Sequence, residues 1–332
     1  MAVTSHDVAR LAGVSQPTVS RALRDQWGVS PRTRRKVREA ARELNYVPIQ
    51  AGRALSTQTA GRVGIVSAEL SNPFYPALIE PLHDRLASIG IRTILVTDRG
   101  NEPVEIEPLI DGSLDGVILT TTELNSSIAE QLQRRGVPTV LVNRMTADAN
   151  TDACVLDNDC GAAQIAELFV SLGHTRIGAI FGPQTTSTGL ERKVGFLKEL
   201  ALHDITIDEH LFYEGPFTHV TGVEGFNQIW EHKPTAIFCA NDVIALGALN
   251  AASAQSVDIP TELTLVGFDN IPMAEWEIFH LTTIGVDFNA LATHAISLLL
   301  DRMNNPDLPP RRVVIKPELI LRGTHGDPVS AK

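Results

Sequence analysis

The sequence of 332 residues lacks the features of secreted, metal-binding and membrane proteins. Its three cysteines, Cys154, Cys160 and Cys239, are odd in number and have no CxxC spacing, so we expect buried structural thiols rather than disulfides or a metal knuckle. No stretch approaches the roughly 20 uncharged apolar residues that a membrane span needs. The N-terminus has no charged start followed by an apolar run, so no secretory signal is expected. These absences predict a cytoplasmic location and no membrane partner.

Motifs of nucleotide-dependent and hydrolytic enzymes are missing as well. No GxGxxG opens a helix after a strand, and neither GxxxxGK[ST] nor GxSxG occurs. His203 and His210 are too isolated to form a metal site. We therefore expect no catalytic activity, no cofactor and no metal.

Charge is divided unevenly along the chain. Residues 1–60 hold ten basic and four acidic side chains, a balance of +6, whereas the whole chain carries −11 and residues 61–332 therefore carry −17. A basic head docks on DNA phosphates by releasing counterions, and an acidic body is kept off the duplex. The length suits two or three domains, and the change of charge predicts a boundary near residue 60.

Two short helices are expected at the N-terminus. Thr4 is a helix cap, and Asp7 is placed to reach back to it, as in a capping box. Val8 and Leu11 are expected on one face of this helix, at i, i+3 spacing. Gly13 supplies the turn, because glycine tolerates a positive φ.

The second helix has the layout of a DNA-reading element. Ser15 is its expected cap, and Pro17 loses no helical hydrogen bond in the first turn. The side chains expected in the core are Val19, Ala22 and Leu23, and those expected to face outward are Gln16, Pro17, Ser20 and Arg21. In a helix-turn-helix, the N-terminal residues of such a second helix meet the bases of the major groove.

A third helix follows, with Ser30 as cap and Pro31 in its first turn. Its apolar stripe consists of Val37, Ala41 and Leu44. Its basic cluster consists of Arg32, Arg34, Arg35, Lys36 and Arg38. A charge run by itself fits a solvated face equally well, but beside a helix-turn-helix it favours phosphate contact for some of these residues.

Beyond residue 60, short apolar runs alternate with amphipathic stretches. We predict strands at Val63–Ser67, Arg92–Thr97, Gly116–Thr120, Thr139–Asn143, Arg176–Phe181, Ala236–Ala240 and Leu263–Phe268. We predict helices at 75–89, 125–135, 160–172, 190–202, 222–231 and 242–254. This alternation predicts parallel sheets with helices on both faces, and the strands suffice for two α/β subdomains with a cleft between them.

Polar and aromatic residues follow the predicted strands, at the edge where ligands of such folds bind. They are Asn72, Phe74 and Tyr75, then Asn143 and Arg144, Asn241 and Asp242, Asp269 and Asn270, together with Arg192 on a following helix. Paired hydrogen-bonding groups beside aromatic faces suit a small polar ligand, for instance a sugar or sugar acid.

The motifs AGVSQPTVSRAL, VSPRTRRKV and LNYVP resemble the head of the lactose-repressor (LacI) family of transcription regulators. In the body, SNPFY, VLDN, LGHTRIGAIFGP, RKVGF, PTAIFCANDVIALGAL, LTLVGFDN and LTTI follow in the family's order almost to the end of the chain. The resemblance implies a helix-turn-helix head at 1–48, a hinge at 49–60, and a periplasmic-binding-protein-like body at 61–332. It also implies a homodimer that binds double-stranded operator DNA and is controlled allosterically by a small-molecule effector.

The resemblance also implies roles for single residues in DNA binding. Gln16, Pro17 and Arg21 occupy the base-reading positions, and Thr18 and Ser20 lie nearer the DNA backbone. Leu55 occupies the position of a leucine that wedges into the minor groove and kinks the duplex. Ile49 and Gly52 depart from the Asn and Ala common in the family, and glycine in a helix costs about 0.5–1 kcal/mol relative to alanine.

For the effector, the resemblance implies that Arg192, Asp269 and either Asn241 or Asp242 grip the ligand. Phe74, Tyr75 and Phe217 pack or stack on it, and Asn72 lines the same site. Arg144 fits either a ligand contact or a bridge between subdomains, and Trp276 fits either a pocket lid or a structural role. The pairs Phe279-His280 and Gly285-Val286 depart from the family pattern near a crossover between subdomains.

Two other kinds of protein compete with a ligand-gated regulator. A sugar-binding transport protein explains the body alone, but it does not explain the basic head. A nucleotide-dependent enzyme lacks its motifs. The sequence therefore predicts a DNA-binding repressor controlled by a small polar effector.

Overall fold

The computed structural model describes residues 3–23, 27–44, 46, 60–67, 69–97, 106–148 and 150–328. The chain divides into two compact units, residues 1–60 and residues 61–332. The predicted hinge over 49–60, apart from Ala60, lies outside the described residues, and Leu55 lies outside them too.

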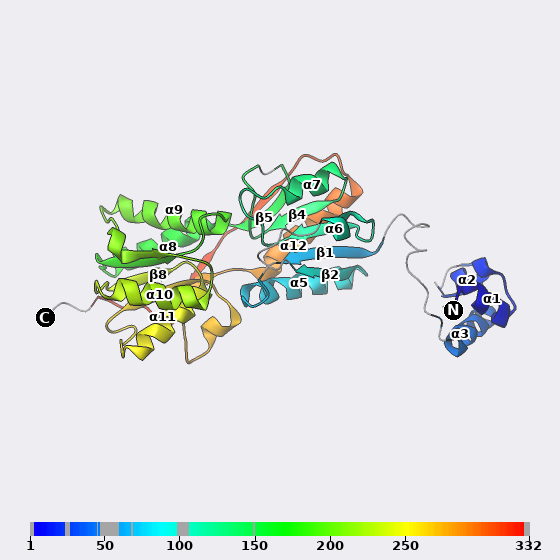
Figure 1. Cartoon of the computed structure of the whole chain (residues 1–332), viewed down its shortest axis with the longest axis horizontal. Helices are drawn as coiled ribbons and strands as arrows, with labels where there is room; N and C mark the ends of the chain where they lie inside the picture. Colours follow the sequence, from blue (N-terminus) through cyan, green and yellow to red (C-terminus); the bar gives the residue numbers. More distant parts are fainter. Residues whose placement is uncertain are drawn as a thin grey trace. The chain divides into compact units, whose positions relative to one another are not determined.

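The described part of the first unit contains the helices α1 (Ser5–Ala12), α2 (Gln16–Leu23) and α3 (Pro31–Glu43), coloured blue in Figure 1. The Asp7 carboxylate accepts hydrogen bonds from the backbone N–H and the hydroxyl of Thr4, at 2.9 and 2.7 Å. Gly13 follows α1 with a φ of 64°, in the left-handed region. The Ser30 hydroxyl accepts a hydrogen bond from the backbone N–H of Thr33 at 3.2 Å. The predicted cap of α3 and the glycine turn are therefore confirmed.

The three helices share a small core built on Val8, Val19 and Val37. Leu11, in contrast, is 47% exposed, although it is only three residues after the buried Val8. Ala12 packs against this core instead. The buried face of α1 thus follows the i, i+4 spacing from Val8 rather than i, i+3.

The second unit contains two α/β subdomains, each with a six-stranded sheet. The strands of the first sheet, in spatial order, are β11 (Arg312–Ile315), β5 (Asp152–Leu156), β4 (Thr139–Val142), β3 (Gly116–Leu119), β1 (Arg62–Ser67) and β2 (Arg92–Thr97). All its neighbouring strands pair in parallel. Its helices are α5 (Phe74–Ser88), α6 (Glu107–Ile110), α7 (Ile128–Arg134) and α12 (Phe288–Asn304).

Both faces of the first sheet are covered, so its central strands are apolar without interruption. Along β3, Ile118 packs on the side of α5 and α12, whereas Val117 and Leu119 pack on the side of α6 and α7. The edge strand β2 is largely exposed. These alternating directions follow from the period of two along a strand.

The second sheet has the order β12 (Glu318–Ile320), β10 (Thr282–Gly285), β9 (Thr264–Asp269), β8 (Ala236–Cys239), β6 (Ile177–Phe181) and β7 (Phe212–Glu214). Its strands pair in parallel except that β12 runs antiparallel to β10. Its helices are α8 (Asn158–Ser171), α9 (Ser187–Leu202), α10 (His219–Trp230) and α11 (Asp242–Ala254). Figure 1 shows α8 and α9 on one face of this sheet and α10 and α11 on the other.

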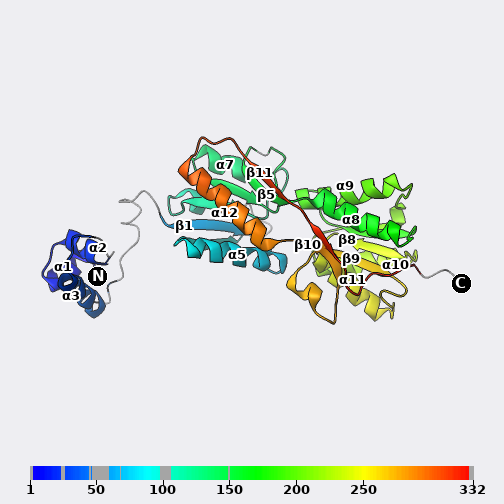
Figure 2. The ribbon, with the colours of Figure 1, turned by 180° about the vertical axis from the view of Figure 1, so that it is seen from behind.

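The chain passes between the subdomains three times, after β5, β10 and β11. Figure 2 shows the result: α12 (orange) lies over the first sheet although it follows β10 of the second sheet in sequence. Two of the passages end in an aspartate that caps the next helix. Asp157 accepts from the backbone N–H of Cys160 at the start of α8, and Asp287 accepts from that of Ala290 at the start of α12.

Each strand and helix predicted from the sequence corresponds to an observed element, and the predicted fold class is confirmed. The prediction did not include the helices α6 and α12 or the strands β5, β7, β10, β11 and β12. It also expected three buried thiols, but only Cys154 and Cys239 are buried, whereas Cys160 is exposed in the first turn of α8. Burial raises the pKa of the Cys154 thiol to about 12, so this thiol stays protonated.

Candidate functional site

A cavity of about 220 Å³, partly open to solvent, lies between the two subdomains of the second unit. The first subdomain lines it with Asn72, Phe74, Tyr75, Asn143 and Arg144, which follow β1 and β4. The second subdomain lines it with Thr188, Arg192, Phe217, Asn241 and Asp269, from α9 and from the residues that end or follow β7, β8 and β9. The cavity is thus built largely at the carboxyl ends of parallel strands, where the sequence placed a ligand site.

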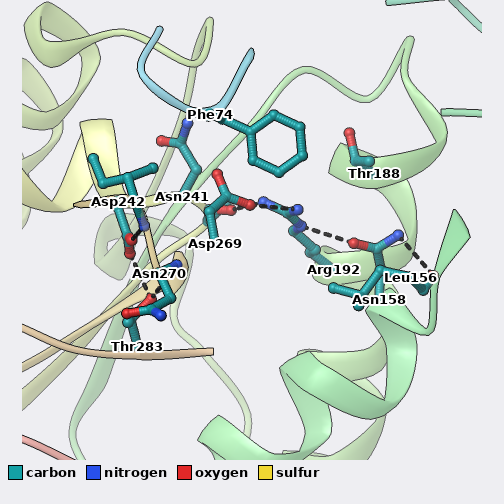
Figure 3. A network of polar contacts seen from close by, with 12 residues as sticks. Phe74, Leu156, Asn158, Thr188, Arg192, Asn241, Asp242, Asp269, Asn270 and Thr283 are labelled. Carbon is teal, nitrogen blue, oxygen red and sulfur yellow. Dashed lines mark hydrogen bonds and ion pairs between the residues drawn. The ribbon is translucent and has the colours of Figure 1, made fainter. Parts of the chain in front are cut away.

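Arg192 is the most firmly held side chain of the cavity. Its Nη2 donates to the Asp269 carboxylate at 2.8 Å, and its Nε donates to the Asn158 side-chain oxygen at 3.0 Å (Figure 3). Its Nη1 donates to the backbone carbonyl of Ala240 at 2.7 Å, and its guanidinium lies 3.8 Å from the centre of the Phe268 ring. Three of the five N–H donors of a guanidinium are therefore used, which leaves two for a ligand.

Asp269 ends β9 with an unusual backbone. Its φ is 120°, and the following Asn270 has a φ of 53°. Non-glycine residues in this region carry strain, which is often found at ligand sites. Burial raises the pKa of the Asp269 carboxyl to about 6, and the neighbouring Arg192 opposes this shift. At neutral pH the carboxyl is mostly ionised and paired with Arg192.

Asp242 occupies a different place from the one that the sequence suggested. Its side chain is fully buried and does not line the cavity. It accepts hydrogen bonds from the Thr283 hydroxyl and from the backbone N–H of Ile271, so it joins β8 to β9 and β10 behind the cavity wall. Burial, followed by the neighbouring Asp269, raises the pKa of Asp242 to about 8. The structure therefore supports a structural role for this residue rather than direct ligand contact.

Asn241 lines the cavity and also caps α11, because its side-chain oxygen accepts from the backbone N–H of Ile244 at 2.9 Å. Its side-chain amide group is the part left for a ligand. Asn143, which follows β4, has a φ of 71°, a conformation that asparagine tolerates better than most residues. The backbone turns sharply there, between β4 and Arg144.

Aromatic rings from both subdomains face the cavity. Phe74 packs edge-to-face against Tyr75, with ring centres 5.4 Å apart. The centre of the Phe217 ring is near two guanidinium groups, 5.7 Å from that of Arg144 and 5.8 Å from that of Arg192. Burial raises the pKa of Tyr75 to about 12, so its phenol remains protonated. These rings offer apolar faces of the kind that pack on the C–H face of a sugar ring.

Two backbone hydrogen bonds join the subdomains beside the cavity. The N–H of Met145 donates to the Ser187 hydroxyl, and the N–H of Leu124 donates to the carbonyl of Thr185, both at 2.9 Å. The two walls of the cavity are therefore in contact in this structure.

In the first unit, α2 presents the side chains that the sequence assigned to DNA. Pro17 and Arg21 are exposed, whereas Gln16, Thr18 and Ser20 are half-buried. The Gln16 amide donates to the Ser5 hydroxyl of α1 at 3.3 Å, and the hydroxyls of Ser15 and Thr18 lie 2.8 Å apart. Arg21 has no ion pair among the described residues. It is thus the long basic side chain of α2 that is free to meet a base.

Comparison with known proteins matches both units. Residues 4–48 match the model of bacterial regulatory proteins of the lacI family, and residues 166–325 match that of periplasmic binding protein-like domains. The chain is 31% identical to the transcriptional repressor CytR of Escherichia coli strain K12 over 329 residues, 97% of this chain and 96% of the relative.

Two solved structures are similar over nearly the full length. The lac repressor dimer bound to operator and the anti-inducer ONPF aligns with a TM-score of 0.84, at 25% identity over 98% of this chain and 99% of that chain. The complex of the transcriptional regulator CelR with cellobiose aligns with a TM-score of 0.74, at 29% identity over 97% and 99%.

The chain belongs to the LacI family of bacterial transcription regulators.

As a LacI-family member, the protein is a DNA-binding repressor controlled by an effector, and it is not an enzyme. Within the described ranges, no helix is long and apolar enough to cross a membrane. The same ranges contain no group of three or more histidine, cysteine or acidic side chains placed to hold a metal ion.

Sequence reasoning missed two positions of this LacI-family cavity. Thr188 lines it from the first turn of α9, and Asn158 holds Arg192 from the start of α8. Asn158 is the last residue of the VLDN motif and lies directly after a crossover between the subdomains. Its place in that motif was the sequence signal that could have identified it as a residue of the site. Trp276, a possible pocket lid in the sequence, is 54% exposed and does not line the cavity.

Proposed function

We propose that a small polar effector, a sugar or sugar acid, binds in the cavity between the subdomains and controls operator binding. The observation that carries the proposal is Arg192, which is immobilised by Asp269, Asn158 and the Ala240 carbonyl yet keeps two free donors. A donor held in place beforehand loses little entropy when it binds a ligand hydroxyl. The similarity to a cellobiose-bound regulator supports a carbohydrate as ligand.

The direct ligand contacts proposed for the second subdomain are Arg192, Asp269, Asn241 and Phe217. Those proposed for the first subdomain are Asn72, Phe74, Tyr75 and Arg144.

Ligand binding is coupled to subdomain orientation through Asn158. Its side-chain oxygen accepts from Arg192, and its amide donates to the Leu156 carbonyl at the end of β5 and to Glu191. Leu156 belongs to the first sheet, so a ligand that moves Arg192 also acts on the crossover between subdomains. The expected coupling between effector and operator is about 1–3 kcal/mol and reciprocal.

The protein acts as a cytoplasmic homodimer that places two heads on the half-sites of a near-palindromic operator. The similarity to a dimeric, operator-bound repressor supports this arrangement. Trp276 and Ile278, which are 54% and 82% exposed, offer an apolar contact for a second copy. In the head, Gln16, Pro17 and Arg21 read bases, Thr18 and Ser20 contact the backbone, and Leu55 wedges into the minor groove.

The effector site is tested with Asp269→Asn, which keeps the shape of the side chain and removes its charge. Because Arg192 then loses its buried partner, effector affinity in titration calorimetry is expected to fall at least tenfold. Asp258→Asn, at an exposed acid of the same subdomain, serves as the control and should bind like wild type. Unchanged affinity in a folded Asp269→Asn protein would refute the assignment of the cavity.

The DNA-reading assignment is tested with Arg21→Ala on operators selected from a random DNA library. Loss of a bidentate guanine contact is expected to remove about 1–3 kcal/mol of discrimination at one base pair. Arg35→Ala, at an exposed residue of α3, should instead weaken binding equally on all sequences and reduce its salt dependence. An Arg21→Ala protein that selects the same operator with the same stringency would show that other residues read the bases.

A further inference from the structure

Arg144 differs from every other charged side chain of the cavity, because it is buried without a partner. The residue is only 7% exposed. Its buried Nε–H has no hydrogen-bond acceptor, and no carboxylate lies within ion-pair distance among the residues that the structure describes. Its guanidinium carbon lies 5.7 Å from the centre of the Phe217 ring, and its positive charge acts at longer range on the Asp269 carboxyl and the Tyr75 phenol, whose pKa values it lowers. A buried arginine N–H that has no acceptor destabilises the folded protein unless a bound group accepts its hydrogen bond.

The charges around the cavity do not balance Arg144. The Asp269 carboxylate is already bound to Arg192 at 2.8 Å, and the Arg144 charge acts on it only at longer range, so one carboxylate faces two guanidinium groups. Asp242 lies behind the wall and binds Thr283 and Ile271. Burial raises its pKa to about 8, and it therefore stays mostly protonated at neutral pH.

Glu69, which precedes Asn72 in the same loop, and Glu191, which precedes Arg192 on α9, are half-buried acids near the cavity. Among the described residues, neither is within ion-pair distance of Arg144, and neither lines the cavity. Glu191 instead accepts from the Asn158 amide at 2.8 Å and pairs with Arg312. The cavity of the folded protein therefore carries about one uncompensated positive charge, on the wall that the first subdomain contributes.

We propose that the effector carries an oxyanion, a carboxylate or a phosphate, and that this group binds Arg144 while the hydroxyls of the effector bind the Arg192–Asp269 pair. The proposal rests on the cavity being the effector site and narrows the ligand from polar molecules in general to anionic ones. A guanidinium presents its donors as a planar fork, which matches carboxylate and phosphate oxygens in bidentate geometry.

The positions of the two arginines explain how such a ligand bridges the cavity. Arg144 follows β4 of the first subdomain, Arg192 lies on α9 of the second, and their guanidinium groups lie 5.7 and 5.8 Å from the centre of the Phe217 ring. The backbone next to Arg144 already binds the start of α9, through Met145 N–H and the Ser187 hydroxyl. An anion bound to Arg144 therefore adds an ionic link across the contact that closes the cavity.

The test compares sugars that differ only in the anionic group, using the full chain in thermal-shift and calorimetric titrations. The sets are glucose with glucuronate and glucose 6-phosphate, galactose with galacturonate, and ribose with ribose 5-phosphate. At least one acid or phosphate is expected to bind about 30-fold or more tightly than its neutral counterpart. Comparison of the carboxylates with the phosphates identifies which oxyanion is used. Neutral sugars that bind as tightly as their anionic counterparts, or no binding by any anionic member, would overturn the proposal.

Variants of Arg144 separate this proposal from the proposed function. Arg144→Gln is expected to weaken the anionic ligand about 30-fold, to the affinity of its neutral counterpart, while Arg135→Gln, at an exposed arginine, serves as the matched charge control and should bind like wild type. If Asp269→Asn weakens binding but Arg144→Gln leaves the affinity for the anionic ligand unchanged, the anion proposal fails and the effector cavity stands. If neither variant affects binding, both fail.

A measurement without ligand gives an independent check. Arg144→Met removes an uncompensated buried charge and fills similar volume, so the melting temperature of the free protein is expected to rise. A lower melting temperature would show that Arg144 serves the fold rather than a ligand, and it would overturn the proposal.

Discussion

Two buried aspartates of the second unit have similar surroundings but different uses. Asp269 reaches the cavity and is paired with Arg192, whereas Asp242 is hidden behind it and bonds to neutral donors. Burial raises the pKa of both carboxyls, to about 6 for Asp269 and to about 8 for Asp242. The guanidinium accounts for the lower value at Asp269, because a neighbouring positive charge favours the ionised form.

The raised pKa of Asp242 predicts a pH-dependent stability. An unfolded aspartate titrates near 3.8, so between about pH 4 and about pH 8 the folded protein holds a proton that the unfolded chain has released. The free energy of unfolding therefore falls as the pH rises through this window. One proton held only by the folded state corresponds to a fall of about 1.4 kcal/mol for each pH unit. Asp242→Asn, which is neutral at every pH, is expected to flatten the profile in urea unfolding from pH 5 to pH 8.

The control for this profile is the exposed acid Asp258, whose change to asparagine should leave the slope as in wild type. Equal slopes in wild type and Asp242→Asn would mean that Asp242 is ionised in the folded protein.

At the scale of elements, the position of Arg192 depends on how closely α9 approaches α8. Gly195, one turn after Arg192, is buried against the α8 backbone, and a Cβ built there would lie 2.4 Å from the Asp159 carbonyl oxygen. Only glycine allows this distance without moving one helix. The short distance between α8 and α9 therefore determines where the Arg192 side chain lies relative to Asn158 and Asp269.

Gly195→Ala is expected to push α9 away from α8 and to destabilise the protein by about 1–3 kcal/mol. Because Arg192 moves with the helix, the affinity for the effector should fall as well. Urea unfolding and calorimetry measure the two effects, and Val194→Ala, at the neighbouring exposed position, controls for the change of residue in the same turn. A Gly195→Ala protein with wild-type stability would show that the helices adjust without strain.

At the scale of the whole molecule, the chain crosses between the subdomains three times, and both subdomains contribute residues to the cavity. Each wall comes from a separate sheet, and the walls meet through Met145 and Ser187 and through Leu124 and Thr185. Any change of angle between the sheets must alter these contacts. A ligand that binds one arrangement better than the other shifts the equilibrium by its difference in affinity.

Dimer formation provides a prediction at the same scale. Ile278→Glu places a charge on the apolar surface formed with Trp276, so the dimer is expected to dissociate at concentrations where wild type is associated, as measured by analytical ultracentrifugation. Operator affinity should fall in parallel, because one head alone contacts one half-site. Leu202→Glu, at another exposed apolar residue, is the matched control. If Leu202→Glu dissociates the dimer and Ile278→Glu does not, the interface lies elsewhere.

Short-range sequence patterns were sufficient to predict many of the helices, turns and strands of this protein. Caps such as Ser30, turn glycines such as Gly13 and apolar runs such as Ala236–Cys239 determine their elements through interactions within a few residues, so they were predictable. The family motifs also placed the cavity residues at the ends of strands. By contrast, the short strands β11 and β12 exist because each pairs with a strand far away in sequence, which no local signal reveals.

The sequence by itself thus determined a basic helical head, an acidic α/β body and the residue types around a ligand cavity. Only the tertiary structure decided which of those residues face the ligand. Asn241 and Asp242 are adjacent in sequence, yet one lines the cavity and the other is buried behind it. Arg192 and Arg144 carry the same charge, but folding pairs Arg192 with a carboxylate, whereas no carboxylate of the described residues lies within ion-pair distance of Arg144. Burial and pairing depend on side chains brought together from distant parts of the chain, and for that reason they emerge only in the folded protein.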